Sequence, residues 1–278
     1  MNFKDLFSCS DEEWLLVDMD FSQLEVCGLA EMTNDSVLIK EVNTGVDIHT
    51  ANAAMWLGKP TSAVTKEERQ RAKVMTFQLQ YGAGAKKIAQ TLDIAESAAI
   101  SFIEKFYEKY KAVKTFHKQL SNFKIQNEDN DHITLFDLCG RKYTVGKKTD
   151  KATGTTYFSL PELKNYPIQG FSTGGIVPVM CNLISENLSM LKVLRCCRII
   201  NTVHDNIMFE VNCEKVLELF RCIEFSFTMF PERFKQLFDY ELKVVYNYDI
   251  KVGPAWSDMD KYTRAEIQTI LEGVRANA

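Results

Sequence analysis

The 278-residue sequence lacks several features that would place it in a simple class of protein. It has no apolar run long enough to span a bilayer, and no stretch has the flanking residues of a signal peptide. It contains no internal repeat and no low-complexity segment. Its net charge of −4 at pH 7 is not the basic excess of a generic nucleic-acid coat protein. We therefore expect a cytoplasmic protein that does not associate with membranes.

The eight cysteines form no recognisable metal-binding or disulfide pattern. None belongs to a CxxC pair, and no histidine lies at zinc-ligand spacing from them. Such cysteines are typical of reduced, mostly buried thiols in a cytosolic protein.

Two short segments, far apart in the chain, carry acids at the ends of predicted strands. Trp14–Val17 is a short apolar run that suits a buried strand, and Asp20 follows it. Farther along, Arg198–Val203 and Ile207–Val211 are β-prone runs on either side of a polar tip that contains Asp205. Two acids in one site repel each other or take up a proton, and a divalent cation removes that penalty. Taken alone, Asp20 is more often simply a helix-start residue and Asp205 simply a turn residue.

Between these segments, the residues from Lys66 to Tyr81 predict a helix with a mixed cationic and aromatic stripe. The stretch has no Gly or Pro, and glycines follow it as stop signals. Arg69, Lys73, Phe77 and Tyr81 recur at every fourth residue, so their side chains follow one another around the helix. Arg and Lys can bind nucleotide phosphates, and the rings can pack on sugar and base. An ordinary amphipathic helix with solvated cations and buried rings is the alternative.

Together with two further segments, these motifs resemble those of family A DNA polymerases, the group that includes bacterial DNA polymerase I and many phage replicases. Five segments occur in the order expected for this family: Asp20–Glu25, Asp47–Thr50, Arg69–Gly82, Asn165–Gly170 and Val203–Asp205. The resemblance implies an α+β fold, in which an antiparallel palm sheet with packed helices accompanies a mostly helical fingers subdomain. It implies that residues 1–32 and 163–278 form the palm and that residues 33–162 form the fingers.

The resemblance also implies a role for each motif residue. Asp20 and Asp205 would hold two Mg²⁺ ions with help from the carbonyl of Phe21, and Lys73 would be catalytic as a proton donor to the departing pyrophosphate. The implied nucleotide-binding residues are Gln23, Glu25, His49, Arg69, Lys73 and Phe77. The implied DNA-binding residues are Tyr81, Asn165, Gln169 and His204, and Gln23 would also face the primer-template. Glu25 would act as the steric gate against ribonucleotides, although its spacing from Ser22 also fits a helix capping box.

The expected function is that of a DNA-directed DNA polymerase, which adds deoxynucleotides to a primer 3′ end by two-metal nucleotidyl transfer. Its substrates would be deoxynucleoside triphosphates and primer-template DNA. One departure is Asn206, because the family usually carries a second acid there. Asp18 lies on the same face of the predicted strand as Asp20, so we hypothesise that it partly restores the missing charge. Gln78 and Gln80 depart from the usual fingers helix.

Asp20 comes only nineteen residues after Met1, whereas the family usually has its thumb, part of the palm and often an exonuclease before this motif. We therefore expect one half of a split, phage-type polymerase, located in the host cytoplasm if phage-encoded. A second polypeptide would carry the thumb, the remaining palm and the 3′–5′ exonuclease. A truncated chain or a degenerate remnant is the alternative.

Two other classes of function compete with a polymerase. A metal-dependent nuclease could use Asp20 and Asp205, but it has no need of the cationic and aromatic stripe. A catalytically weakened DNA-binding or scaffold subunit of a replication complex is favoured by Asn206. The basic and aromatic stretch from Lys105 to Lys118 could face DNA or could be a solvated helix face.

Several further elements are predicted along the chain. One helix is expected from Glu96 to Ile125, a polar loop from Lys147 to Thr156, and a long helix from about Gly170 to Leu194. A helix from Cys213 to Phe225 and a strand near Glu241–Val252 follow the second carboxylate segment.

Overall fold

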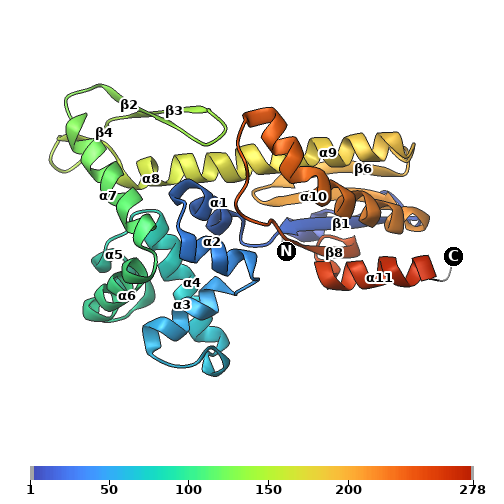
Figure 1. Cartoon of the computed structure of the whole chain (residues 1–278), viewed down its shortest axis with the longest axis horizontal. Coiled ribbons are helices and arrows are strands. Elements are labelled where there is room, and N and C mark those ends of the chain that lie inside the picture. Colours follow the sequence, from blue (N-terminus) through green and yellow to red (C-terminus); the bar gives the residue numbers. More distant parts are fainter. Residues whose placement is uncertain (1–2, 277–278) are drawn as a thin grey trace. The chain divides into compact units, whose positions relative to one another are not determined.

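The computed structural model describes residues 3–276, and it confirms the expected α+β fold (Figure 1). The strands are β1 (Trp14–Phe21), β2 (His132–Phe136), β3 (Lys142–Gly146), β4 (Lys148–Thr149), β5 (Thr156–Tyr157), β6 (Cys197–Val203), β7 (Asn206–Asn212), β8 (Tyr248–Ala255) and β9 (Asp258–Thr263). Among the described residues, no helix is both long and apolar enough to cross a membrane.

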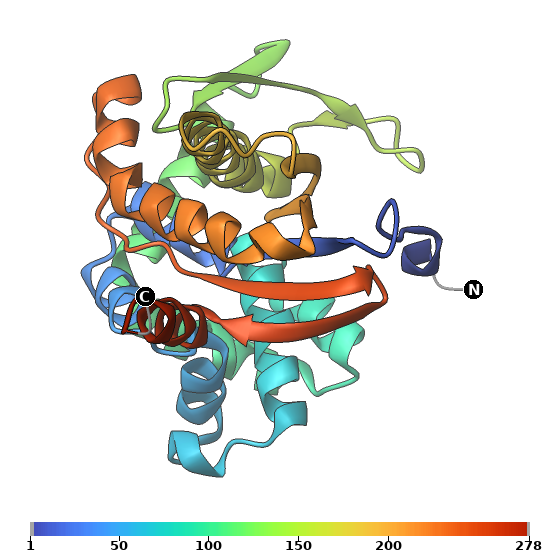
Figure 2. The same cartoon turned by 90° about the vertical axis from the view of Figure 1, so that its right-hand side faces the viewer.

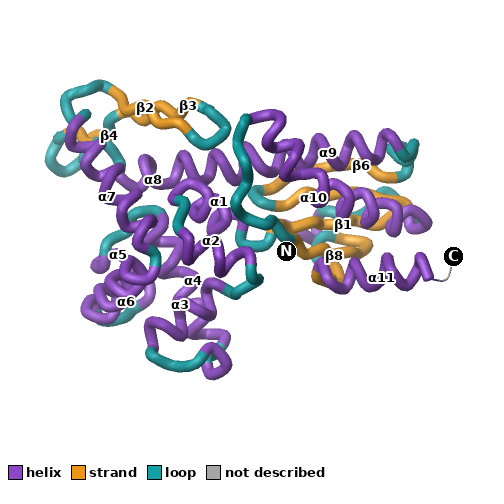
Figure 3. Tube along the Cα trace, viewed as in Figure 1, coloured by secondary structure: helices purple, strands orange, loops and turns teal. Residues whose placement is uncertain are grey.

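Helices make up most of the remaining structure, as the colouring of Figure 3 shows. They are α1 (Leu24–Thr33), α2 (Ser36–Asn43), α3 (Ile48–Leu57), α4 (Lys66–Gln80), α5 (Ala85–Leu92), α6 (Glu96–Lys109), α7 (Lys111–Gln126), α8 (Leu160–Gln169), α9 (Val177–Met190), α10 (Val216–Phe238) and α11 (Arg264–Ala276). Three short 3₁₀ segments are η1 (Phe3–Leu6), η2 (Thr61–Ala63) and η4 (Cys213–Lys215), and a π-helical segment, η3 (Gly170–Ile176), joins α8 to α9.

The chain folds into two compact units. Unit 1 consists of the described parts of Met1–Leu24, Ser172–Leu242 and Tyr246–Ala278. Unit 2 consists of Glu25–Phe171 and the short return segment Lys243–Val245. The return segment is held within unit 2 because the carboxylate of Glu31 accepts hydrogen bonds from the backbone N–H groups of Lys243 and Val244, both at 2.8 Å.

Unit 1 is built on a five-stranded antiparallel sheet in the order β6-β7-β1-β8-β9. The central strand β1 contains alternating residue types, and successive side chains of a strand point to opposite faces. Phe21 lies on the face that is covered by α10, with its ring 5.4 Å from that of Phe227. Figure 2 shows α10 (orange) running alongside the strands. Asp18 and Asp20 therefore lie on the opposite face of the sheet.

The helix α10 covers the sheet because its apolar residues recur at helical spacing. Its buried positions include Leu219, Ile223, Phe227, Phe230 and Phe234, which follow one face of the helix. The helix is longer than the predicted segment ending at Phe225, and it continues through Pro231.

Unit 2 is mostly helical and carries two small antiparallel ribbons, β2–β3 and β4–β5. The helix α4 begins with a capping box, in which Thr65 and Glu68 each accept a hydrogen bond from the backbone of the other. A separate apolar cluster lies where α7 and α8 meet the ribbons, and its buried members are Leu120, Ile133, Leu135, Val145, Phe158 and Leu163.

The single helix expected from Glu96 to Ile125 is wrong, because α6 ends at Lys109 and α7 starts at Lys111. Tyr110 between them is fully buried, and its hydroxyl donates to Glu41 at 2.7 Å and lies 3.1 Å from Asn52 Oδ1. The break therefore depends on contacts with residues far away in the sequence and has no Gly or Pro to signal it.

Other boundaries also differ from the expected ones. Part of the polar loop from Lys147 to Thr156 forms the short ribbon β4–β5. The last expected strand starts at Tyr248, since the preceding residues return to unit 2. The strand β9 and the helix α11 had no counterpart in the sequence-based expectations.

Replacing Phe209 by alanine tests the packing of the central sheet. Phe209 in β7 has no exposed surface, so Phe209→Ala is expected to lower the free energy of unfolding by about 3–5 kcal/mol through lost burial and a residual cavity. Chemical denaturation measures this loss. Phe225→Ala on α10 is the control, because Phe225 is 52% exposed, and a similar loss in both variants would contradict the described packing.

Candidate functional site

Asp20 and Asp205 lie close together because a backbone hydrogen bond joins the end of β1 to the turn between β6 and β7. Asp20 lies near the end of β1, and Asp205 lies in the tight turn that joins β6 to β7. The backbone N–H of Phe21 donates to the carbonyl of Asp205 at 3.0 Å, so the turn is tied to the end of β1. His204 permits this tight turn by adopting a left-handed backbone conformation with φ of 57°.

The environment of Asp20 disfavours its negative charge. Burial, followed by the charge of Asp205, raises the pKa of Asp20 to about 6, and Asp18 and Asp249 contribute in the same direction. The positive charge of Lys251 opposes this shift. A cation bound at these carboxylates would remove the repulsion, which fits the expectation of divalent metal ions.

Preformed metal clusters are not found in the part of the chain that the structure describes. No group of three or more His, Cys, Asp or Glu residues within 3–276 is arranged to hold an ion. Mg²⁺ is usually held by one or two carboxylates, with water and phosphate oxygens as its other ligands, so Mg²⁺ at Asp20 and Asp205 stays a prediction.

Asp18 is almost fully buried on the same face as Asp20. Its Oδ2 accepts a hydrogen bond from the indole N–H of Trp256 at 3.3 Å and lies 3.7 Å from the ammonium group of Lys251. Its other oxygen is buried and has no hydrogen-bond partner. Asn206, at the position of the family's second acid, uses its side-chain oxygen to accept from the backbone of Val203 at 2.9 Å.

The residues of the stripe on α4 form a row in unit 2, and several of them contact neighbouring side chains. Arg69 is bound to Asp47, the N-cap residue of α3, with 3.2 Å between Nη2 and Oδ1. The ammonium group of Lys73 lies 5.7 Å from the ring centroid of Phe77. The rings of Phe77 and Tyr81 are stacked, with their centroids 6.3 Å apart. These contacts hold cations at one end of the row and rings at the other.

His49 joins the same row from α3, where its ring centroid lies 5.5 Å from that of Phe77. Burial, followed by the charges of Arg69 and Lys73, lowers the pKa of His49 to about 4. The ring is therefore neutral at pH 7. Its Nδ1 is buried and has no hydrogen-bond partner within the described chain.

Glu25 is linked to the aromatic end of the row. The hydroxyl of Tyr81 donates a hydrogen bond to the carboxylate of Glu25, and Gln80 donates to its backbone carbonyl at 3.4 Å. These bonds fix the position of the predicted steric gate relative to α4.

The remaining predicted residues lie in three different settings. Asn165 and Gln169 lie one turn apart on α8, where the Asn165 amide donates to Gln169 at 3.3 Å. Gln23 has a left-handed backbone with φ of 55°, and its side-chain oxygen is buried without a partner. His204 is exposed at the hairpin turn.

Two charged residues beside Asp20 were missed in the sequence. Asp249 and Lys251 lie on β8, where they are paired in register with Asp20 and Asp18. The alternation of Tyr248, Asp249, Ile250 and Lys251 is a strand signal, but only the pairing of β8 with β1 shows that its polar face meets the acids.

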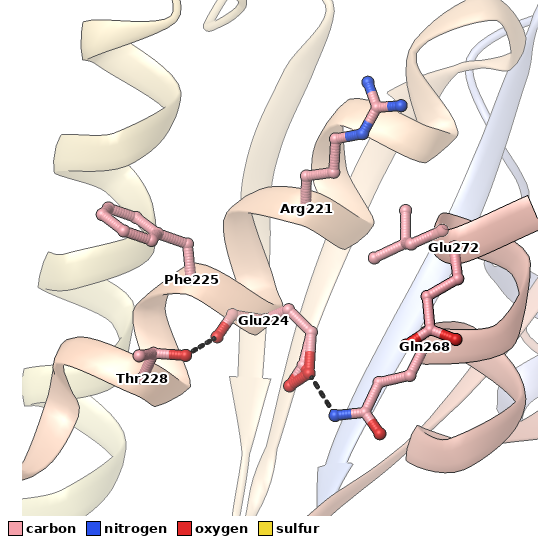
Figure 4. Close-up of a pocket in the computed structure, with 7 residues that line it drawn as sticks. Arg221, Glu224, Phe225, Thr228, Gln268 and Glu272 are labelled. Carbon is pink, nitrogen blue, oxygen red and sulfur yellow. Dashed lines mark hydrogen bonds between the residues drawn. The ribbon is translucent and has the colours of Figure 1, made fainter. Parts of the chain in front are cut away.

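A cavity of about 350 Å³ lies between α10 and α11 in unit 1, and Figure 4 shows the side chains around it. Its lining includes Arg221, Phe225 and Glu272 but none of the predicted site residues. Glu224 accepts a hydrogen bond from Gln268 at 3.0 Å and is therefore already paired.

Comparisons with known proteins agree with the motifs. The sequence model of "DNA polymerase family A" matches residues 1–258. The chain is 28% identical over 252 residues to DNA polymerase I of Geobacillus stearothermophilus, covering 91% of this chain and 27% of that protein. It is 30% identical over 224 residues to DNA polymerase I of Aquifex aeolicus, covering 78% and 36%. It thus spans about a quarter to a third of the length of these relatives.

A solved structure also shares this fold. It is the POL domain of Pol1 from M. smegmatis in complex with DNA primer-template and dNTP. It superposes with a TM-score of 0.74 at 25% identity, and the match covers 91% of this chain and 42% of that one.

The raised pKa of Asp20 predicts a pH-dependent effect of Asp20→Asn on stability. Below pH 4, near the pKa of the unfolded side chain, Asp20 is protonated in both states and its burial carries no charge penalty. This stability is lost as the pH rises through about 6, the pKa of Asp20 in the folded protein. In metal-free buffer, Asp20→Asn is therefore expected to raise the melting temperature more at pH 7.5 than at pH 4.5. Thermal unfolding measures this difference, and the exposed Asp258→Asn is the control. An equal effect of Asp20→Asn at both pH values would contradict the prediction.

Proposed function

Because this chain belongs to DNA polymerase family A, we propose that it is the part of a DNA-directed DNA polymerase that binds the incoming deoxynucleotide and joins it to a primer 3′ end. The observation that supports this most directly is the proximity of Asp20 and Asp205 at one end of the sheet. The cationic and aromatic row on α4 supplies the groups that a nucleoside triphosphate needs.

Asp20, Asp205 and the carbonyl of Phe21 would hold two Mg²⁺ ions, which supply charge stabilisation for the attacking and leaving oxygens of nucleotidyl transfer. The tie between the Phe21 N–H and the Asp205 carbonyl would keep the two carboxylates in place for this task. Lys251 lowers the local negative charge before any cation is bound.

The triphosphate would be bound by Arg69, Lys73 and the neutral His49. Arg69 is oriented by Asp47, so its guanidinium is held in place before the nucleotide arrives. Lys73 would stabilise the charge that develops on the pyrophosphate and would donate a proton to it. Phe77 would pack on the sugar of the nucleotide.

Other side chains would select the sugar and hold the DNA. Glu25 would exclude a ribose 2′-hydroxyl, and Tyr81 would lie near the templating base. The amides of Gln23, Asn165 and Gln169 suit minor-groove acceptors that every base pair presents, and His204 would also face the duplex. In this proposal unit 1 corresponds to the palm and unit 2 to the fingers, close to the boundaries 1–32, 33–162 and 163–278.

We further propose that the thumb, the remaining palm and a 3′–5′ exonuclease are contributed by a second polypeptide. This chain matches 27% and 36% of the length of its two relatives, and the proposal assigns the counterparts of their remaining regions to that partner. Adding candidate partner chains from the native source to a primer-extension assay tests this, and robust processive synthesis by this chain alone would contradict it.

A weakened, scaffold-like subunit is a second candidate function. One observation favours it, because Asn206 uses its side chain to close the hairpin turn and adds no charge to the site. Calorimetry separates the two, since a polymerase requires Mg²⁺-dependent binding of deoxynucleotides and a scaffold does not.

Single-turnover primer extension with Mg²⁺ tests the carboxylates. Asp20→Asn and Asp205→Asn are each expected to slow nucleotide addition by about 10³-fold, because each removes preorganised charge stabilisation. Asp18→Asn is expected to slow nucleotide addition less than these two substitutions. If Asp18 compensates for the missing acid, adding Asn206→Asp to the Asp18→Asn chain is expected to restore part of the lost rate. Asp258→Asn is the control, and an unchanged rate in Asp205→Asn would overturn the assignment.

Ribonucleotide discrimination tests Glu25. Removing its side chain in Glu25→Ala makes room for a 2′-hydroxyl, so the preference for dNTP over rNTP is expected to fall by roughly 10–100-fold in single-nucleotide incorporation. Tyr81→Phe is the matched control, because it removes the hydrogen bond to Glu25 but leaves the carboxylate side chain in place. If Glu25→Ala lowers only the melting temperature, Glu25 has the purely structural role.

A further inference from the structure

Gly170, at the end of α8, lies against the hydroxyl of Tyr143 on β3. A Cβ added at Gly170 would overlap the hydroxyl oxygen and Cζ of Tyr143 and would lie 2.9 Å from its Cε1, closer than a Cβ atom approaches such atoms. The backbone of Gly170 has φ of −63° and ψ of −44°, which any residue adopts in a helix. Glycine is therefore required here for the close approach of the tyrosine and not for the backbone conformation.

The side chain of Tyr143 is held in place along its length. Its ring packs against the apolar cluster where α7 and α8 meet the ribbons. Its hydroxyl donates to Oδ2 of the buried Asp137 at 2.8 Å, and Oδ1 of Asp137 accepts from the backbone N–H groups of Cys139 at 2.9 Å and Arg141 at 3.0 Å. Burial, followed by the hydrogen bond to Asp137, raises the pKa of Tyr143 to about 12, so the hydroxyl keeps the proton that it donates. Tyr143 is thus a fixed support for the backbone that lies against it.

The backbone that lies against Tyr143 is held only weakly by its own helix. Pro167 lies inside α8 and has no N–H group to donate to the preceding turn. The N–H of Gly170 is shared between the carbonyls of Tyr166 and Pro167, and the chain then widens into the π-helical segment η3. The contact with β3 therefore supplements the hydrogen bonds of the last turn of α8.

The same turn carries two of the amides that are proposed to bind DNA. Gln169 directly precedes Gly170, and Asn165 lies one turn earlier. The amide of Asn165 donates to Oε1 of Gln169 at 3.3 Å, and Oδ1 of Asn165 is buried with no hydrogen-bond partner in the described chain. A displacement of Gly170 would therefore move Gln169 and disturb its contact with Asn165.

We propose that Tyr143, held by Asp137, is a positioning residue that fixes the amides of Asn165 and Gln169 for contact with minor-groove acceptors of the primer-template. The inference rests on the proposed function, which assigns DNA contacts to these two amides. Tyr143 would act through the backbone of Gly170. A hydrogen bond to a base edge requires a narrow range of distances and angles, so even a small displacement of Gln169 would weaken it.

The test measures DNA binding and needs no catalysis. Fluorescent primer-template duplexes carry either adenine or 3-deazaadenine at one position, and binding of the full chain is measured by anisotropy, position by position. In 3-deazaadenine a C–H group replaces the minor-groove N3 acceptor, so one hydrogen bond is lost. For the unsubstituted protein, 3-deazaadenine at one position is expected to raise the Kd about five- to tenfold, and Gln169→Ala is expected to abolish this rise.

Gly170→Ala tests the contact with Tyr143. Alanine is favourable at helical φ and ψ, so the added methyl group disturbs the structure only where it meets the tyrosine. The rise in Kd caused by 3-deazaadenine is expected to fall to about twofold or less, because a misplaced amide no longer distinguishes the two bases. Gly146→Ala on β3 is the matched control, since a Cβ there meets no atom within 4 Å, and the full rise is expected. An undiminished rise in Gly170→Ala would overturn the proposal.

Tyr143→Phe tests the hydroxyl group with little risk of misfolding. It keeps the ring against the apolar cluster and removes the oxygen that Asp137 holds and that lies against Gly170. A smaller rise in Kd than in the unsubstituted protein is expected. Tyr157→Phe on β5 is the control, because it removes a hydroxyl from a tyrosine that is 42% exposed. If Tyr143→Phe lowers only the melting temperature and keeps the full rise, Tyr143 is a purely structural residue and the proposal is wrong.

Failure of this inference is distinguishable from failure of the proposed function. If 3-deazaadenine raises the Kd of the unsubstituted protein at no position, the minor-groove contacts assigned to the amides are absent, and the inference fails with them. If the rise is present and Gln169→Ala abolishes it, while Gly170→Ala and Tyr143→Phe keep it, the assigned contacts hold and only the positioning role of Tyr143 is overturned.

Discussion

The alternation of side chains along β1 is the constraint on which the rest of unit 1 depends. Odd-numbered residues such as Phe21 bury their side chains under α10, and the acids Asp18 and Asp20 therefore share the opposite face. Neighbouring strands then add Asp249, Lys251 and the turn with Asp205 to that face. A shift of β1 by one residue would turn the acids into the apolar core, so the hydrophobic packing and the polar site stabilise the same register.

Unit 2 holds its charged groups by a different means. Arg69 is paired with Asp47 outside its own helix, and His49 is kept neutral by burial and by the cations beside it. The two units therefore present opposite chemistry, with excess negative charge around Asp20 and fixed cations along α4. The proposed function would use both kinds of group, the acids for metal ions and the cations for phosphate oxygens.

Much of this arrangement could be predicted from local patterns. The helix from Lys66 and the hairpin around Asp205 follow from periodicity and turn residues, and the structure confirms both elements. The break at Tyr110 could not be predicted, because it depends on hydrogen bonds to Glu41 and Asn52. The position of the β8 charges beside Asp20 could not be predicted either, because it depends on the pairing of β8 with β1. The roles of the site residues stay predictions.

The order of the strands has a consequence for how the chain folds. β1 ends at Phe21, yet its partners β7 and β8 begin only at Asn206 and Tyr248, after all of Glu25–Phe171. During synthesis, almost two hundred residues are therefore added after the central strand before either of its partner strands has been made. Unit 2, with its contacts closer in sequence, can form during that interval. Closing the sheet around β1 therefore requires contacts between residues far apart in the sequence, and contacts of this kind slow folding and leave unpaired strand edges open to aggregation.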